Sequence, residues 1–451
     1  MERLIYMESE YKNNFLREFE NKCKDYTYVP LIIPEVETII AFGDIHGDYK
    51  MAVKLLLMSG VAEIIDEKKE KHDDVDHETD IEEIVLVNNE EAVRYNNNDK
   101  YETKNHSYVV KHENRIIKSN VEYKMRWIGG KTHVVQVGDQ IDRCRVYGGM
   151  TCDLPETTIH DENSDVKIMR LFTDLHEQAV LVGGAVISLF GNHELNNALG
   201  DMTYVSMKGI DGFKNYVDPK NKHIKFNDGR SARVYAFKPG HEIGTFMGCT
   251  RTAAVVIGSN LFAHAGIVNG LIKEQENHKK NEWRLTYNPN NFNKQVYYFR
   301  DREGFENINI AIKKWLIGIA DNKQRNVDDL VRSTYMNKSM FWNRILGSIS
   351  PNVDYESNEC KNNIDKVLKL FRINNIIVGH TPQSMAHNFY INATCGKKVW
   401  RIDVASSSAF DRYDEMYIHN GNKIESRRFQ YLKIVNDKNF YVCFEDKCMN
   451  A

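Results

Sequence analysis

Several short apolar runs in this chain each end in a residue that can bind a metal ion. The segments that follow these runs read GDIHGD, GDQIDR, GNHE, HAG and GHTP. Carboxylates and imidazoles placed directly after buried strands are costly unless a partner or a ligand compensates them. Because the strand ends on one side of an open α/β sheet form one crevice, we expect these polar side chains to converge.

The order of the apolar patterns predicts an α/β fold. Strand-like runs rich in Val and Ile alternate with helix-like segments, a pattern typical of a largely buried sheet. The strand-like runs are residues 39–42, 133–137, 185–190, 255–263, 376–378, 399–404 and 431–444. The helix-like segments are residues 51–60, 166–180 and 364–372.

Composition changes along the chain suggest how it is divided. We expect a catalytic domain at residues 35–445, an N-terminal arm at residues 1–34 and a tail at residues 446–451. Within the domain, residues 61–130 are rich in charged residues and Asn. Such segments bury too little apolar area to offset the entropy of ordering the backbone. We therefore interpret 61–130 as a solvated insertion with short hairpins.

The overall composition favours a soluble, cytoplasmic protein. The hydrophobic content is 42% and the net charge is -3, which gives no argument for nucleic acid or a membrane surface as a partner. The first residues are too charged for a signal peptide, and no apolar run is long enough to span a membrane. The cysteines lack CxxC spacing, so we expect free thiols in a reducing compartment. They are Cys23, Cys144, Cys152, Cys249, Cys360, Cys395, Cys443 and Cys448.

The donor types at the strand ends indicate a pair of divalent cations. Carboxylate, amide and imidazole donors without thiolates suit Mn, Fe or Zn. Each strand end alone is more often a simple turn, and His264 between two alanines also fits a core histidine. If these strand ends do not bind metal, however, each of them needs its own independent explanation. The candidate ligands form two sets that share a carboxylate: Asp44, His46 and Asp139; and Asp139, Asn192, His264 and His380.

The motifs and their order resemble those of the calcineurin-like metallophosphoesterases. GDxHG, GDxxDR and GNHE resemble the phosphoprotein phosphatase family, and GDQIDR, GNHELNN, FWNR and VGHTPQ resemble its bacterial-like, or Shewanella-like, phosphatases. The resemblance spans residues 42 to about 410 but does not cover the insertion. It implies a metallophosphoesterase αβ sandwich of two mixed sheets flanked by helices, with two metal ions at the strand ends.

The resemblance also implies roles for residues that do not bind metal. His193 matches a general acid, Asp142 the carboxylate that orients it, and Arg143 a phosphate-binding arginine. Arg344, in SMFWNRILG, matches a second phosphate arginine, although isoleucine stands where glycine often follows. The alternative for Arg344 is a surface arginine on an amphipathic segment. Cys144 replaces the usual glycine after Arg143, where it either narrows the pocket, introduces redox sensitivity or is simply tolerated.

These features favour a metal-dependent phosphoric monoester hydrolase acting on a phosphorylated protein or peptide, at Ser/Thr or Tyr. A metal-bridging hydroxide would attack phosphorus in line, since two dications about 3.5–4 Å apart lower the pKa of a bound water to about 7. One alternative is a dinucleoside-polyphosphate or RNA-cap pyrophosphohydrolase, but GNHD is commoner than GNHE among those relatives. Another alternative is a non-catalytic scaffold, which should lack a metal ligand or the general acid.

Overall fold

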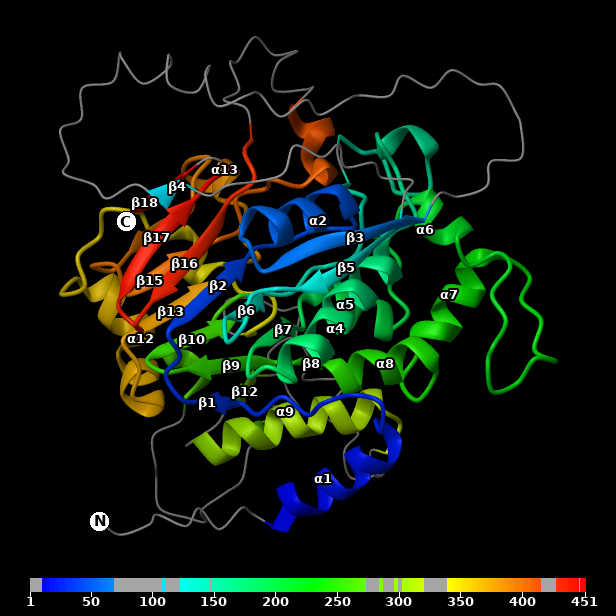
Figure 1. Ribbon diagram of the computed structural model, residues 1–451, viewed down its shortest axis with the longest axis horizontal. Coiled ribbons are helices and arrows are strands. Elements are labelled where there is room, and N and C mark those ends of the chain that lie inside the picture. The colour runs from blue at the N-terminus through cyan, green and yellow to red at the C-terminus, as the bar shows by residue number, and fades with distance from the viewer. Residues whose placement is uncertain are drawn as a thin grey trace.

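Two large mixed sheets form the centre of the protein, and helices lie outside them (Figure 1). The computed structural model describes residues 10–68, 108–109, 122–146, 148–272, 284–286, 296–298, 302–319, 339–414, 427–445 and 447–451. The predicted α/β class with two mixed sheets is confirmed. The helix predicted from MAVKLLLMSG forms as α2. Asp48 caps its N-terminus, because the Asp48 carboxylate accepts a hydrogen bond from the backbone N–H of Met51.

The first sheet has eight strands in the order β4-β18-β17-β16-β2-β6-β7-β8. Their bounds, in that order, are Tyr108–Val109, Lys447–Asn450, Asn439–Cys443, Tyr431–Val435, Thr38–Phe42, His133–Gln136, Ala185–Leu189 and Arg251–Thr252. Strands β2, β6, β7 and β8 are parallel, whereas β16 joins β2 in the antiparallel sense. The segments that follow β2, β6 and β7 therefore start from one edge of the sheet.

The second sheet has six strands in the order β1-β9-β10-β13-β15-β14. Their bounds, in that order, are Ile32–Ile33, Ala254–Ile257, Asn260–Ala263, Asn375–Val378, Val399–Arg401 and Asn392–Thr394. Strands β10, β13 and β15 are parallel, so the segments after them also begin at a shared edge. Two further two-stranded sheets pair β3 (Ala62–Lys68) with β5 (Glu122–Trp127) and β11 (Arg284–Thr286) with β12 (Val296–Tyr298).

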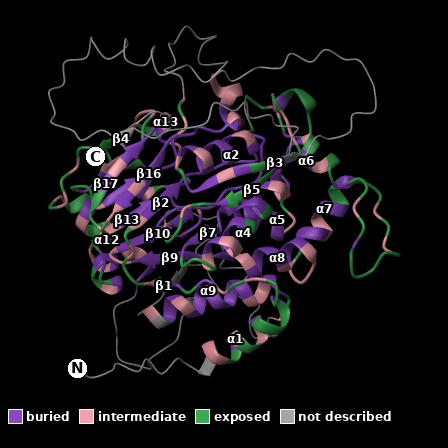
Figure 2. Ribbon diagram, in the orientation of Figure 1, coloured by how far each residue is buried: buried purple, intermediate pink, exposed green. Residues whose placement is uncertain are grey.

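Alternate side chains of the central strands face two different cores. On β2, Ile39 and Ala41 belong to the core between the two sheets, while Ile40 and Phe42 pack with α2 and α4. This period of two is what a strand buried on both faces requires. Figure 2 shows the resulting buried centre, with the exposed residues gathered in peripheral helices and loops.

Helices cover the outer faces of both sheets. Helices α2 (Tyr49–Met58) and α4 (Asp165–Val180) lie against the first sheet. The core on the outer face of the second sheet contains residues of α7 (Gly229–Phe237), α8 (Glu242–Thr250), α9 (Arg302–Leu316) and α12 (Asn358–Phe371). The shorter helices are α5 (Asn192–Ala198), α6 (Met207–Asp211), α11 (Ile345–Ser348) and α13 (Gln383–Ala386).

The predicted N-terminal arm contributes to the folded core. Helix α1 (Glu10–Lys22) lies beside α9 in Figure 1, and its Phe15 and Phe19 pack in a cluster with Ile310 and Ile317. Strand β1 then pairs with β9 in the parallel sense. The arm is thus fixed at both its helix and its strand.

The insertion and the tail differ in detail from the sequence interpretation. The ends of segment 61–130 form the β3–β5 pair, and the buried rings of Tyr123 and Trp127 join the core around α2. Apart from β4, residues 69–121 of that insertion lie outside the described residues. Residues 447–450 of the predicted tail form β18, because they pair in register with β17.

The prediction of free thiols is wrong, because every cysteine is paired and none is free. The disulfides are Cys23–Cys249, Cys144–Cys152, Cys360–Cys395 and Cys443–Cys448. The first pair is separated by 226 residues, so only the tertiary fold brings its two sulfurs together. This pairing removes one of the observations on which the cytoplasmic prediction rested, since disulfides persist mainly in oxidising compartments. Among the described helices, none has the length and apolar character needed to cross a membrane.

Candidate active site

The candidate ligands lie where the polypeptide turns sharply after a strand. His46, Asp139 and His380 have positive φ angles of 50°, 54° and 65°. Non-glycine residues in this region cost about 1–3 kcal/mol each and persist only where their surroundings hold them. Here the backbone N–H of His46 donates to the Asp139 carbonyl at 2.9 Å, which ties the turn after β2 to the turn after β6.

The first group of donor atoms comes from the turns after β2, β6 and β7. One donor atom each from His46, Asp139 and His193 lie within 4.8 Å of one another. His46 Nε2 is 4.0 Å from Asp139 Oδ2 and 3.8 Å from Asp44 Oδ2. The predicted ligands Asp44, His46 and Asp139 are thus brought together, with His193 beside them.

The second group shares Asp139 and adds residues from the second sheet. Donor atoms of Asp139, His264 and His380 again lie within 4.8 Å of one another. His264 Nε2 is 3.2 Å from Asp139 Oδ2 and 2.9 Å from Asn192 Oδ1. The other ring nitrogen of His264 is 2.9 Å from the Val137 carbonyl, which fixes the ring. All four predicted ligands of the second set therefore meet.

Burial and mutual charge set the protonation of these groups. Burial would raise the pKa of Asp139, but His264 and His193 outweigh it and hold that pKa well below its ordinary value. Burial alone would lower the pKa of His264, but the nearby Asp139 carboxylate has the larger effect, so the pKa of His264 is raised. Burial lowers the pKa of both His46 and His380 well below the ordinary value, which favours neutral rings with a free lone pair.

Asp403, which follows β15, is a further buried carboxylate at the cluster. Its Oδ2 has no hydrogen-bond partner among the described residues. Burial, with a further contribution from Asp139, raises the pKa of Asp403 to about 6. Burial, Asp403 and Asp139 likewise raise the pKa of Asp44 well above its ordinary value. The site thus combines three buried carboxylates, one of them with an unpaired oxygen, and several imidazole rings. This combination of oxygen and nitrogen ligands fits a site for divalent cations.

A second polar network holds His193 from behind. Asp142 Oδ2 lies 2.8 Å from His193 Nδ1. The same carboxylate accepts hydrogen bonds from Asn197 Nδ2 at 2.9 Å and from Arg233 Nη2 at 3.3 Å. The His193 ring also contacts the Tyr204 ring, with centroids 4.9 Å apart. This is the arrangement expected of an imidazole whose tautomer is fixed by a carboxylate.

The predicted phosphate arginines occupy different environments. Arg143 is buried, and it donates from Nη1 to the Gly47 carbonyl at 3.3 Å and from Nη2 to the His160 carbonyl at 3.1 Å. Its Nη1 also lies 3.4 Å from Glu162 Oε1 and 3.6 Å from Asp48 Oδ2. The terminal nitrogens of Arg143 therefore already contact protein acceptors.

Arg344 lies at the rim of the cluster. Its side chain is exposed, and its Nη1 donates to the His380 carbonyl at 2.9 Å. The neighbouring Trp342 carbonyl lies 3.2 Å from His380 Nε2. The FWNR segment is thus placed beside the predicted ligand His380.

Sequence reasoning missed several residues of this site. Asp403 follows an apolar strand just as the predicted ligands do, so the same rule would have found it. Glu194 lies within GNHE, and its carboxylate accepts from the backbone N–H groups of Asp139, Gln140 and Gly191 at 2.7–3.0 Å. Tyr204 had no sequence signal, because only the fold places it against His193.

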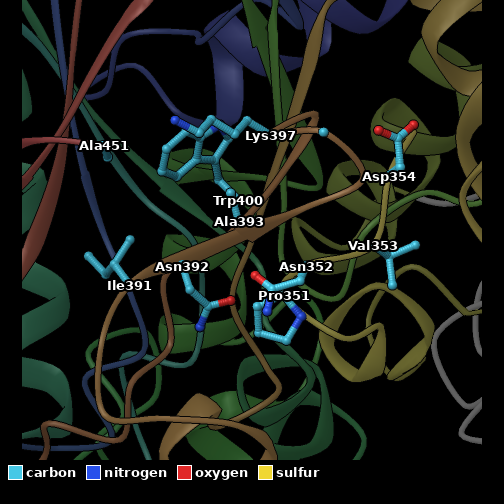
Figure 3. A pocket seen from close by; sticks show the side chains of 11 residues that line it. Pro351, Asn352, Val353, Asp354, Ile391, Asn392, Ala393, Lys397, Trp400 and Ala451 are labelled. Atoms are coloured by element: carbon cyan, nitrogen blue, oxygen red, sulfur yellow. The ribbon is translucent and has the colours of Figure 1, made fainter. Parts of the chain in front are cut away.

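The structure also contains a cavity of about 380 Å³, whose lining side chains are shown in Figure 3. Asn352, Asn392, Lys397 and Trp400 are among the residues that line it. Lys397 precedes β15 whereas Asp403 follows it, so the cavity lies toward the other end of that strand. None of the candidate metal ligands lines this cavity.

The known proteins most relevant to this site are phosphatases. The chain is 25% identical over 346 residues to Shewanella-like protein phosphatase 2 of Arabidopsis thaliana, covering 70% of this chain and 71% of the relative. The cold-active protein-tyrosine phosphatase of a psychrophilic Shewanella species has a similar fold, with a TM-score of 0.50 and 16% identity over 94% of this chain and 83% of that one. The predicted resemblance to the Shewanella-like phosphatases is confirmed.

A viral relative is more similar in sequence. An uncharacterized protein of Acanthamoeba polyphaga mimivirus is 33% identical over 287 residues, which cover 62% of this chain and all of the relative. The chain belongs to the same family as this mimivirus protein. No protein-family model matches the chain.

Proposed function

We propose that this protein is a dinuclear-metal phosphatase that hydrolyses phosphate monoesters on a phosphorylated protein or peptide. The observation that carries the proposal is the place of Asp139, whose carboxylate belongs to both groups of side chains that could hold a metal ion. A shared carboxylate is the feature expected where two cations are held close together. The similarity to a Shewanella-like protein phosphatase supports the substrate class.

The two sets of ligands divide between the two sheets. Asp44, His46 and Asp139 would hold one ion; Asp139, Asn192, His264 and His380 would hold the other. When bound, such a pair of cations supplies Lewis acidity and a water of lowered pKa as nucleophile. Asp403 adds negative charge beside both sets.

The protein's own groups would move the proton and bind the phosphoryl group. We assign His193 to proton donation, because the motif resemblance favours it and because Asp142 fixes its Nδ1. The other ring nitrogen, Nε2, would then carry the proton for the leaving oxygen. Arg344 at the rim has a guanidinium that suits a phosphoryl oxygen. Arg143 is the second arginine that the resemblance assigns to phosphate.

The test is hydrolysis of p-nitrophenyl phosphate, a phosphopeptide panel and diadenosine tetraphosphate, each with added Mn²⁺. We expect turnover of the monoesters, and loss of that turnover in Asp139→Asn. A control variant, Asp153→Asn, changes an exposed carboxylate and should keep the activity. If the protein hydrolyses diadenosine tetraphosphate but not the phosphopeptides, it is a pyrophosphohydrolase instead. No turnover with any divalent metal would indicate a non-catalytic scaffold.

A further inference from the structure

Arg145 is a buried cation whose hydrogen bonds are incomplete. Only 9% of the residue is exposed. Its Nη1 donates to the carbonyls of Asp142 and Cys144 at 3.2 and 2.7 Å. Its Nη2 is buried and has no hydrogen-bond partner among the described residues. A buried guanidinium N–H without an acceptor costs free energy, so a missing acceptor is the simplest account of it.

The guanidinium lies beside the candidate metal ligands. Arg145 Cζ is 5.2 Å from the centre of the Phe410 ring, and the same ring lies 5.7 Å from the His46 ring. After burial, the charge of Arg145 is the next cause that lowers the pKa of His46. Yet Arg145 forms no ion pair with Asp44 or with any other carboxylate among the described residues. The cation thus lies near the acidic cluster without being neutralised by direct contact.

Arg143, two residues earlier, is in the opposite situation. Its terminal nitrogens contact two backbone carbonyls and lie within 4 Å of the Asp48 and Glu162 carboxylates. These contacts anchor the turn after β6 to the start of α2. Of these two arginines, only Arg145 has a terminal nitrogen without a hydrogen-bond acceptor in the part of the chain that the structure describes.

The backbone around Arg145 is fixed by covalent and polar contacts. The Cys144–Cys152 disulfide links the residue before Arg145 to a position eight residues later. The Cys144 N–H donates to the Tyr204 carbonyl at 3.2 Å. The Tyr413 hydroxyl donates to the Val146 carbonyl at 3.0 Å. A guanidinium on such a supported turn is preorganised to bind, which limits the entropy lost on binding.

We propose that Arg145 is a phosphate-binding residue, donating from Nη2 to a phosphoryl oxygen of the substrate. The proposal rests on the proposed phosphatase function and extends it to a residue outside the recognised motifs. A guanidinium donates charge-assisted hydrogen bonds to phosphate that are about twice as strong as neutral ones. Because the same contact is made with product phosphate, Arg145 contributes to substrate and product binding alike.

The test compares Arg145→Gln and Arg145→Lys with the wild type. We expect Arg145→Gln to raise both the KM for p-nitrophenyl phosphate and the Ki for inorganic phosphate at least tenfold, with the metal content unchanged. Arg145→Lys should recover part of the affinity, because it keeps the charge but loses the planar fork. Arg126→Gln, at an exposed ion pair with Glu63, is the matched control and should leave both constants unchanged.

Phosphate binding by titration calorimetry separates this proposal from the function on which it rests. If the wild type turns over no phosphoester but binds phosphate in an Arg145-dependent way, the phosphatase function fails and the role of Arg145 stands. If KM, Ki and phosphate affinity all stay within twofold in Arg145→Gln, the proposal is overturned. Loss of bound metal in Arg145→Gln, without a change in phosphate affinity per metal-loaded site, would also overturn it.

Discussion

Asp142 Oδ2 lies 2.8 Å from His193 Nδ1, and both side chains are buried. The contact fixes the ring so that Nε2 faces the cluster of candidate ligands. Two roles fit this geometry, because a carboxylate can orient either a general acid or a metal-bound imidazole.

The variants His193→Asn and Asp142→Asn decide between those roles. As a general acid, His193 should contribute about 10²–10⁴-fold to kcat, and Asp142→Asn should lose much of the same factor. The double variant should be little worse than His193→Asn alone, because both changes remove one proton transfer. The readouts are kcat and the bound metal per chain. Loss of a metal ion from His193→Asn would assign the residue to metal binding instead.

Arg233 should be a large contributor to stability. It is fully buried, and its guanidinium pairs with Asp165 at 2.8 Å and with Asp142 at 3.3 Å. Removing one partner of a buried ion pair leaves an uncompensated charge and costs about 3–5 kcal/mol. We expect Arg233→Met to lose that much in urea unfolding. The surface variant Arg230→Met, which loses an exposed pair with Asp153, should lose no more than about 1 kcal/mol. Equal losses would contradict the account.

The disulfides should stabilise the fold to different extents. Closing a longer loop removes more entropy from the unfolded chain, up to about 5 kcal/mol for the Cys23–Cys249 pair and about 2 kcal/mol for Cys443–Cys448. The paired variants Cys23→Ser with Cys249→Ser should therefore lower the Tm more than Cys443→Ser with Cys448→Ser. Calorimetry measures both. Thiol labelling of the unreduced, denatured wild type should find no free cysteine; reactive thiols there would contradict the pairing.

Glu162 should make stability depend on pH. Burial raises its pKa from 4.5 to about 7, against the opposing charge of Arg143. Below pH 4.5 the group is neutral in both states; as the pH rises to 7 only the unfolded state ionises, so stability is lost across that interval. Relative to wild type, Glu162→Gln should gain roughly 3 kcal/mol of unfolding free energy between pH 4.5 and 7. Parallel pH curves for the two proteins would exclude this.

Much of this arrangement was predictable because strand-end positions obey a simple rule. Apolar runs with a period of two identify buried strands, and the polar residue after each run must lie at the sheet edge. That logic places Asp44, Asp139, Asn192, His264 and His380 together, and the structure does bring them together. The roles of these residues in binding and catalysis remain predictions, which the experiments test.

The rest depends on contacts between distant segments. The Cys23–Cys249 pair and the packing of Tyr204 on His193 follow from tertiary structure, and no local pattern encodes them. Arg145 lies two residues beyond Arg143, outside the motif, and only its surroundings in the fold show that its Nη2 lacks a hydrogen-bond partner among the described residues. Residues 447–450 read as a polar tail because an edge strand needs few apolar residues.

The metal content of the purified protein decides whether the candidate site holds the proposed pair of ions. Elemental analysis after reconstitution with Mn²⁺, Fe²⁺ or Zn²⁺ should find two ions per chain in the wild type. Asp139→Asn should lose tight binding of both ions, since its carboxylate is shared, while Asp153→Asn keeps them. A wild-type protein that holds no ion or a single ion, or an Asp139→Asn variant that retains two, would contradict the account.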